Sequence, residues 1–382
     1  MKHMKLLKLL LPALVLGLSL SGCSGPPENI IGLAAPAEAV NAYGVKKRDV
    51  YVMTTRAASD DPSLMYSGER SEGLGLARVT VTIPPNHQTG AIERSEKGPP
   101  DPRKSFTIID PVIFSDAKQF QASVGAELTE LPKPDQRILL FVHGYNTTMT
   151  AAILRTAQLA NDMNFEGIPV VFSWASRGKT LNYVYDMNSA LSARDRLIEG
   201  ATLLAQAGPA EFDIMAHSMG NLLTVEAIRQ AHLEGKYVAS GRVKNIILAS
   251  PDIDMDLFTT QLDDLPADRR QFWVMISEND RALSVSQRIA GGINRVGNAD
   301  SQRLAELGVA VVDLSQIDDK TSLHHAKFAD APEVVQLIGR RLESQGSIAN
   351  DDDGDLSLKR LATDLASAPI ILLGQGPLLL NQ

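Results

Sequence analysis

The chain has only one cysteine, Cys23, so no disulfide can form within it. It contains no HExxH pattern and no clustered cysteines and histidines with zinc-site spacing, so no bound metal is predicted. Neither a phosphate-binding nor a dinucleotide-binding glycine motif follows a predicted strand, and we expect no cofactor. The chain has 37 Lys and Arg against 45 Asp and Glu and no basic block, which argues against a nucleic-acid partner.

The composition provides enough apolar material for a large core. The chain has 382 residues, of which 44% are hydrophobic, and this allows one large domain or two smaller ones. Charged residues make up 21%, close to the average of globular proteins, so most of the chain is expected to fold.

Residues 1–22 have the pattern of a secretory signal peptide. Three lysines precede a short apolar run, Leu9 to Leu20, which is too short to span a bilayer comfortably. The following LSGC resembles the lipobox of bacterial lipoproteins, in which cleavage leaves the cysteine, here Cys23, as the lipid-modified first residue. We therefore expect acyl chains such as palmitate on Cys23. The alternative is an ordinary signal peptide with an incidental cysteine.

The residues around the predicted cleavage site also indicate a location in the bacterial envelope. Ser24 and Gly25 follow Cys23, and the absence of aspartate there favours the outer membrane, with the protein facing the periplasm. Removing the leader's three lysines lowers the net charge from −8 to −11. Because an acidic chain should not bind an anionic lipid surface through its own side chains, the lipid on Cys23 is the expected anchor.

Composition divides the rest of the chain into three parts. Residues 23–45 are rich in Pro, Ala and Gly and indicate a tether. Residues 46–344 are predicted to form one domain, whose first part, 46–130, is a β extension. Residues 345–382 form an acidic and then apolar tail, which is either disordered or docked on the domain or the membrane. The strands expected in the extension are 49–56, 77–84 and 106–114, with a polar loop between the first two.

From residue 136 onward, apolar strands alternate with helices. Near-continuous apolar strands indicate a mainly parallel sheet with helices on both faces, which is the α/β class. The expected strands are 137–146, 168–176, 212–218, 243–253, 272–280 and 309–317, and the expected helices are 151–163, 190–207, 222–231 and 285–293.

Ser218 lies where an apolar strand meets a helix. Ala216 and Gly220 are small, as required two positions either side of the apex of a sharp strand-to-helix turn. Such a turn presents a serine as a nucleophile, and the helix N-terminus favours developing negative charge. The alternative is a strand that simply turns into a helix.

Attack by this serine on a carbonyl would require two donors for the resulting oxyanion. One candidate is the backbone N–H of Met219, the residue after the nucleophile. The other is the N–H of Tyr145 in the glycine turn that ends segment 137–146, where Gly144 allows close backbone approach. The alternative for this loop is a plain turn.

The candidate base and acid follow later strands. Only His324 and His325 lie beyond the last strand, where the chain order Ser…Asp…His places the base. Asp280 ends strand 272–280 and is the favoured acid, because the acid most often follows that strand. Asp252 and Asp254 end the preceding strand and remain alternatives, with helix capping as their other role.

The motifs together resemble a bacterial, esterase- and lipase-like branch of the α/β-hydrolase superfamily. The resemblance covers residues 51 to 342, and it implies an α/β-hydrolase fold. The motifs that carry it, in chain order, are VHGYN, FSWASRGK, AHSMGN, ASPDID, SENDRAL and HHAKF.

The resemblance also implies a set of site residues. The branch usually has a glycine where His324 stands, and because this sequence departs from that pattern, His324 remains an alternative to His325 as the base. The implied triad is Ser218, Asp280 and His325, with the N–H groups of Tyr145 and Met219 as oxyanion donors.

Two residues of FSWASRGK follow the strand beside the expected site. Trp174 is a candidate wall of an acyl pocket, and Arg177 a candidate partner for an anionic group of the substrate. A packed tryptophan and a solvated arginine are the alternatives.

These observations favour a serine hydrolase acting on a small-molecule or lipid ester through an acyl-enzyme. The competing hypothesis is a non-catalytic scaffold of the same fold that binds other envelope components, since fold alone does not imply function.

Overall fold

The computed structural model describes residues 37–61, 64–95, 100–236, 243–266, 270, 272–318, 323–343 and 371–373. The predicted signal peptide, Cys23 and most of the tail therefore lie outside the described residues. Among the helices that are described, none combines the length and the apolar character needed to cross a membrane.

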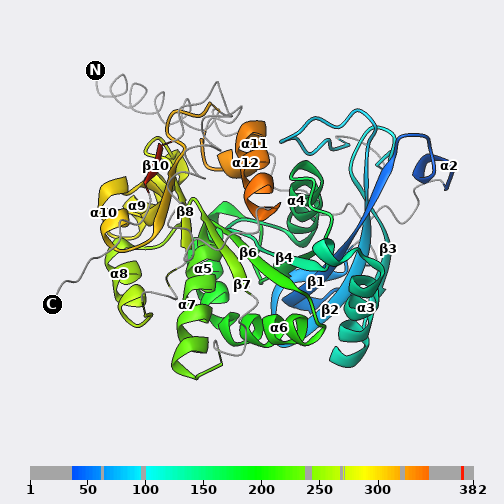
Figure 1. Cartoon of the computed structure of the whole chain (residues 1–382), viewed down its shortest axis with the longest axis horizontal. Coiled ribbons are helices and arrows are strands. Elements are labelled where there is room, and N and C mark those ends of the chain that lie inside the picture. The colour runs from blue at the N-terminus through cyan, green and yellow to red at the C-terminus, as the bar shows by residue number, and fades with distance from the viewer. Residues whose placement is uncertain are drawn as a thin grey trace, which may run out of the picture.

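A single twisted sheet runs through the molecule in the order β10-β9-β8-β7-β6-β4-β5-β1-β2-β3 (Figure 1). The seven strands from β9 to β1 are mutually parallel, and β2, β3 and β10 add antiparallel edges. The prediction of a mainly parallel sheet is thus confirmed. The strands are β1 (Lys46–Ala58), β2 (Tyr66–Ile83), β3 (Thr107–Ile113), β4 (Arg137–Val142), β5 (Ile168–Ser173), β6 (Glu211–His217), β7 (Val243–Ala249), β8 (Phe272–Ile276), β9 (Ala310–Asp313) and β10 (Ile371–Leu373).

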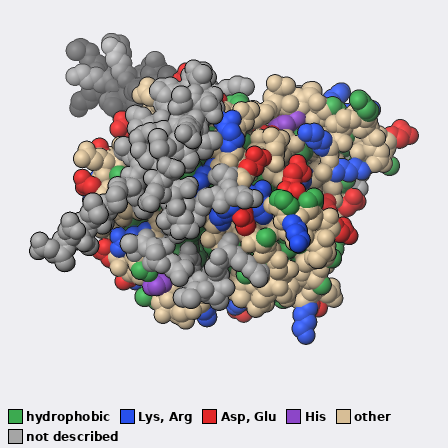
Figure 2. Space-filling model, in the orientation of Figure 1, with side chains coloured by type: hydrophobic (Ala, Val, Ile, Leu, Met, Phe, Trp, Pro, Cys, Tyr) green, Lys and Arg blue, Asp and Glu red, His purple; other side chains and the backbone are tan. Residues whose placement is uncertain are grey.

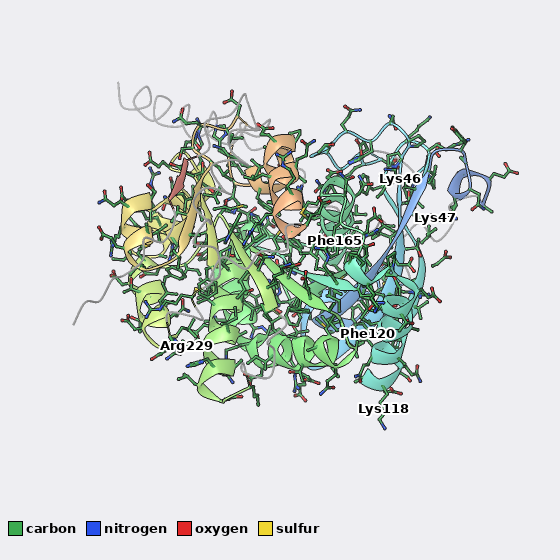
Figure 3. The ribbon with its side chains drawn as sticks, viewed as in Figure 1. Lys46, Lys47, Lys118, Phe120, Phe165 and Arg229 are labelled. Atoms are coloured by element: carbon green, nitrogen blue, oxygen red, sulfur yellow. The ribbon has the colours of Figure 1, made fainter. Side chains whose placement is uncertain are left out.

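Helices cover both faces of the sheet and bury a core on each. On one face α3, α5, α6, α7, α8 and α10 pack against the strands, and on the other α4, α11 and α12 do so. Phe120 points from α3 toward β1, where its ring meets that of Tyr51 at 5.5 Å (Figure 3). The helices are α2 (Ala37–Val40), α3 (Ala117–Glu130), α4 (Met149–Asp162), α5 (Tyr183–Ser192), α6 (Arg194–Gln206), α7 (Met219–Leu233), α8 (Met255–Asp263), α9 (Arg281–Ile289), α10 (Ser301–Glu306), α11 (Lys327–Asp330) and α12 (Pro332–Glu343).

Several elements differ from the sequence prediction. Helix α3 lies within residues 46–130, which were expected to form a β extension. Strand β2 begins at Tyr66, inside the segment expected to be a polar loop, because its first half pairs with the end of β1 through two register shifts. The helix expected over 190–207 is two helices that meet at Ala193. In the first half of β2, Arg70 also donates to Ser189 Oγ of α5 at 2.7 Å. Strand pairing and this tertiary contact together override the weak strand propensity of these polar residues.

Charge is distributed without a broad basic face on the side of the molecule shown in Figure 2, where acidic and basic side chains are interspersed. At the far edge of the sheet, Ile371–Leu373 pairs antiparallel with β9. These three residues of the predicted tail therefore dock on the domain, which was one of its two expected states.

Candidate active site

Ser218 occupies a strained turn between β6 and α7. Its φ of 53° and ψ of −124° lie in a region that residues other than glycine rarely adopt. The turn packs tightly against the end of β4. A Cβ on Gly144 would lie 2.7 Å from Ser218 Cβ, and one on Gly220 would lie 2.4 Å from the His143 carbonyl oxygen. Glycine is therefore required by this close approach both at Gly144, after β4, and at Gly220, after the serine.

The two expected oxyanion donors face no backbone acceptor. Met219 is the first residue of α7, and first-turn N–H groups have no carbonyl partner in their own helix. Within the described ranges, neither its N–H nor that of Tyr145 donates to a backbone carbonyl. The Tyr145 ring packs edge-on against Tyr183 at 5.3 Å, and its hydroxyl donates to the Thr180 carbonyl. Both N–H groups can thus donate to a ligand oxygen.

Asp280 and His325 form a buried pair. His325 Nδ1 donates to Asp280 Oδ2 at 2.7 Å, and Asp280 Oδ1 accepts the N–H of Leu283, which caps α9. Asp280 is fully buried. Burial alone would lower the pKa of His325, but the hydrogen bond and charge of Asp280 and the charge of Asp252 outweigh it and raise that pKa. With Nδ1 protonated, the neutral ring presents Nε2 as a proton acceptor.

The loop carrying His325 lies against the strand end that carries the serine. His217 precedes Ser218, and its Nε2 donates to the His325 carbonyl at 3.3 Å. The two imidazole rings are 4.7 Å apart. Burial and the neighbouring charge of His325 hold the pKa of His217 well below its usual value, so His217 stays neutral there. No direct hydrogen bond joins Ser218 and His325, and such bonds often tighten only when substrate is bound.

The alternative residues have other partners. Asp254 caps α8 by accepting the N–H groups of Asp256 and Leu257. Asp252 accepts the Ser286 hydroxyl at 2.5 Å and forms a buried ion pair with Arg295 at 3.2 Å.

His324 has a left-handed φ of 54°. A glycine adopts that conformation without strain, which gives a physical reason for the glycine expected at this position from the resemblance. The hydrogen bond to Asp280 is made by His325.

Trp174 and Arg177 are held by neighbours within the protein. Trp174 is fully buried, its Nε1 donates to the His143 carbonyl at 2.7 Å, and its ring stacks on that of His143. Arg177 donates to Glu69 at 2.9 Å and lies over the Tyr185 ring. These contacts fit the packing role for Trp174. They place Arg177 in an ion pair with Glu69.

Sequence reasoning missed a buried network around Arg56 of β1. Its guanidinium donates to the carbonyls of Thr147 and Ser176, both at 2.7 Å, and to Ser173 Oγ at 2.8 Å. Burial lowers the pKa of Arg56 to about 10, so it remains charged at neutral pH. Arg56 thereby fixes the loop that follows β4, which carries the Tyr145 N–H.

His143 lies in the same network and is not available as a base. Its Nδ1 donates to the Gly144 carbonyl at 2.8 Å, so Nε2 is the acceptor that faces Ser173 Oγ at 3.2 Å. Burial and the charge of Arg56 lower the pKa of His143 to about 3. The contact between Ser173 and His143 therefore supports the loop from inside the protein.

Asp186 of α5 is the acidic member of this network, and burial raises its pKa above the ordinary value. Its Oδ2 accepts the Asn146 N–H at 3.2 Å and the Ser176 hydroxyl at 2.5 Å, and its Oδ1 accepts the Arg177 N–H at 3.0 Å. Asp186 is fully buried. No local pattern marked Asp186 or Arg56, because their partners come from distant parts of the chain.

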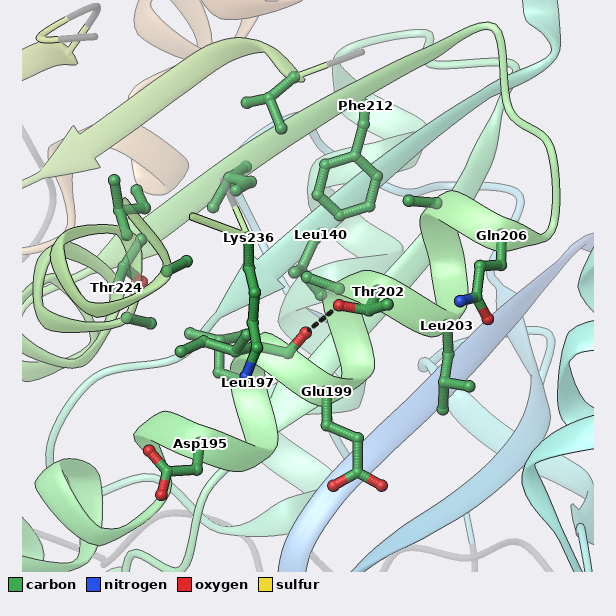
Figure 4. A pocket seen from close by; sticks show the side chains of 18 residues that line it. Leu140, Asp195, Leu197, Glu199, Thr202, Leu203, Gln206, Phe212, Thr224 and Lys236 are labelled. Atoms are coloured by element: carbon green, nitrogen blue, oxygen red, sulfur yellow. Dashed lines mark hydrogen bonds between the residues drawn. The ribbon is translucent and has the colours of Figure 1, made fainter. Parts of the chain in front are cut away.

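A separate cavity of about 710 Å³ lies between α6, α7 and the buried strands. Figure 4 shows Leu140 and Phe212 on its sheet side, with Lys236 and Asp195 among its polar residues. Its lining includes none of the candidate triad or oxyanion residues. In the part of the chain that the structure describes, no group of three or more His, Cys, Asp or Glu side chains is placed to hold a metal ion.

The parallel sheet with helices on both faces and the strained serine between strand and helix define an α/β-hydrolase. Residues 117–341 match the family described as an alpha/beta hydrolase of unknown function (DUF900), and the chain belongs to this family. No curated protein matches the sequence significantly.

Several solved structures are similar to the chain. An esterase from Pyrobaculum calidifontis is 13% identical, with 61% of this chain and 94% of that chain covered and a TM-score of 0.33. A thermostable carboxylesterase cloned from a metagenomic library is 12% identical, with 78% and 88% covered and a TM-score of 0.35. A fungal esterase from Rhizomucor miehei is 13% identical, with 78% and 83% covered and a TM-score of 0.33.

Proposed function

We propose that this protein is a serine hydrolase that cleaves carboxylic esters, with Ser218 as its nucleophile. The observation that carries the proposal is the backbone of Ser218, whose φ of 53° and ψ of −124° store strain at the apex of a buried turn. Strain of this kind persists only where the surrounding structure enforces it, and it clusters at functional sites.

The reaction follows from the atoms around this turn. Ser218 Oγ attacks the ester carbonyl while His325 Nε2 takes the hydroxyl proton, and Asp280 stabilises the resulting imidazolium. The N–H groups of Met219 and Tyr145 donate to the oxyanion. Collapse of the tetrahedral intermediate releases the alcohol, which takes the proton from His325. Water then attacks the acyl-enzyme by the same route, releasing the acid and freeing Ser218.

Ser250 resembles Ser218 in its backbone and serves as a comparison. It follows the neighbouring strand β7 and also has a positive φ, 45°. The residue after it is Pro251, which has no N–H and cannot supply an oxyanion donor. Ser218 is instead followed by Met219 at the start of a helix.

The proposal is tested with a fluorophosphonate probe on the chain from residue 24 to 382, which keeps every described residue. We expect covalent labelling of the wild type, turnover of short p-nitrophenyl esters, and loss of both in Ser218→Ala. Ser250→Ala is the matched control and should keep labelling and turnover. A folded wild type that neither labels nor turns over ester would contradict the proposal and favour the scaffold hypothesis.

We further propose that the enzyme works on a lipid anchor at Cys23 in the bacterial outer membrane, facing the periplasm. The support is the order of lysines, apolar run and LSGC at the N-terminus. Cells fed radiolabelled palmitate should incorporate label into the wild type and not into Cys23→Ala. Equal incorporation into both would show that Cys23 is not the lipidated residue.

A further inference from the structure

Large apolar side chains gather around the proposed active site. Eleven exposed ones occur in the described residues, and six of them lie on three short segments beside the site. We call these six the mouth cluster. Its members, with their exposed fractions, are Leu181 (99%), Val184 (60%), Val285 (52%), Ile289 (59%), Ile293 (41%) and Leu323 (54%).

Hydrogen bonds join the segments that carry the mouth cluster. The Tyr183 hydroxyl lies 2.8 Å from Ser286 Oγ, which places the start of α5 against α9. Val184 and Val285 are the chain neighbours of these two residues. The Arg281 N–H donates to the Leu323 carbonyl at 3.0 Å, which brings Leu323 to the start of α9.

The same segments border the reacting groups. Asp280 caps α9, and His325 follows Leu323 by two residues. The Thr180 carbonyl next to Leu181 accepts the Tyr145 hydroxyl. Val285 and Ile289 are four residues apart, so they share one exposed face of α9. The segments that carry the mouth cluster therefore adjoin those that carry Asp280, His325 and Tyr145.

Two of the three segments that carry the mouth cluster have a charge opposite to that of the whole chain, whereas the third, at Leu323, follows the exposed Asp318. Residues 179–185 and 281–293 contain Lys179, Arg281 and Arg288 and no Asp or Glu, whereas the whole chain has a net charge of −8. All three cationic residues are exposed. Exposed apolar side chains interspersed with lysine and arginine are typical of surfaces that bind anionic bilayers, where apolar groups enter the headgroup boundary. The net charge of the whole chain hides this local reversal.

We propose that the mouth cluster docks on an anionic phospholipid surface, so that the ester substrates are lipids taken from that surface. The part about substrates rests on the proposed function. Docking through these residues orients the start of α5 and all of α9 toward the bilayer and leaves Ser218 at its boundary.

The test is flotation of the chain from residue 24 to 382 with vesicles of phosphatidylcholine alone or of equal parts phosphatidylcholine and phosphatidylglycerol. We expect binding to the anionic vesicles, weakened by salt because charge contributes. The double variant Leu181→Asp/Val285→Asp should bind at least about tenfold more weakly, since it loses buried apolar area and adds repulsive charge. It should retain turnover of a soluble p-nitrophenyl ester.

The matched controls are Leu233→Asp and Ile113→Asp, whose side chains are 59% and 61% exposed on elements away from the site. Both should float like the wild type. The proposal is overturned if the wild type does not bind anionic vesicles or binds neutral ones equally well. It is also overturned if the control variants lose as much binding as the double variant. Ser218→Ala should still float, so a protein that docks without hydrolysing esters would refute the enzymatic proposal alone.

Discussion

Replacing Asp280 by Asn is expected to lower kcat/KM for a soluble ester about ten-thousand-fold, the usual cost of losing the carboxylate of a serine triad. The Asn oxygen can still accept the Leu283 N–H that caps α9, which turns the amide nitrogen toward His325 Nδ1. A donor at that position forces the proton onto Nε2, where the ring can no longer accept the serine proton. Steady-state kinetics with p-nitrophenyl acetate measures the effect.

Asp254→Asn is the matched control, because Asp254 caps α8 in the same manner and bonds to no histidine among the residues that the structure describes. Its activity should stay within about twofold of the wild type, as for most substitutions away from special features. Equal losses in both variants would mean that Asp280 acts only as a helix cap.

The pH profile separates the two roles further. The reaction needs neutral His325. Burial lowers the pKa of His325, but Asp280 and the charge of Asp252 together raise it above its ordinary value. In the wild type, kcat/KM should therefore fall as pH drops through a value above 6.5, the ordinary pKa of histidine. Asp280→Asn removes the main interaction that raises the pKa of His325 and leaves burial, which lowers it. The acid limb of the residual activity should therefore shift to lower pH. An unchanged acid limb would contradict this assignment of the base.

Replacing Asp186 by Asn is expected to lower kcat about a hundredfold, comparable to the loss of one oxyanion donor. The carboxylate accepts three donors on two oxygens, from Asn146, Ser176 and Arg177. An amide presents a donor to at least one of them. The loop carrying the Tyr145 N–H then loses a fixed contact, and we expect the free energy of unfolding to fall by about 1–3 kcal/mol.

Asp213→Asn provides the control for Asp186→Asn. Asp213 is equally buried and lies on the nucleophile strand, but it contacts Asn245 and is remote from the loop after β4. Burial raises the pKa of Asp213 to about 6, so its ionised form is disfavoured in the folded state and an amide should not destabilise the protein at neutral pH. Kinetics and urea unfolding of both variants give the comparison. A similar loss of kcat in Asp213→Asn would show that any buried carboxylate matters.

The local pattern was sufficient to predict the main strands and the turn at Ser218. Segments of five to seven residues that are wholly or largely apolar specify buried parallel strands, and small residues around a serine specify a sharp turn. Chain order after successive strands led us to expect an acid at Asp280 and a base at His324 or His325, and the resemblance implied His325. The structure places His325 Nδ1 2.7 Å from Asp280 Oδ2.

The supporting network could not be predicted in this way. Arg56 reaches the residues after β4 and β5 across 91 to 120 positions of sequence. Such contacts depend on which strands become neighbours in the sheet. A single arginine in a strand of alternating polar and apolar residues does not indicate which strands those are. The first half of β2 was missed for the same reason, because its polar residues pair only when β1 is beside them.

The position of β1 in the sheet has a consequence for how the chain can be divided. Strand β1 pairs with β5 on one side and with β2 on the other, although residues 117–341 alone match the family. A fragment that starts at residue 117 would leave the backbone of β5 unpaired along one side, creating an open edge that invites association with other chains. The smallest unit that can be excised, transplanted or permuted as a stable protein therefore starts before Lys46, more than seventy residues upstream of the family match.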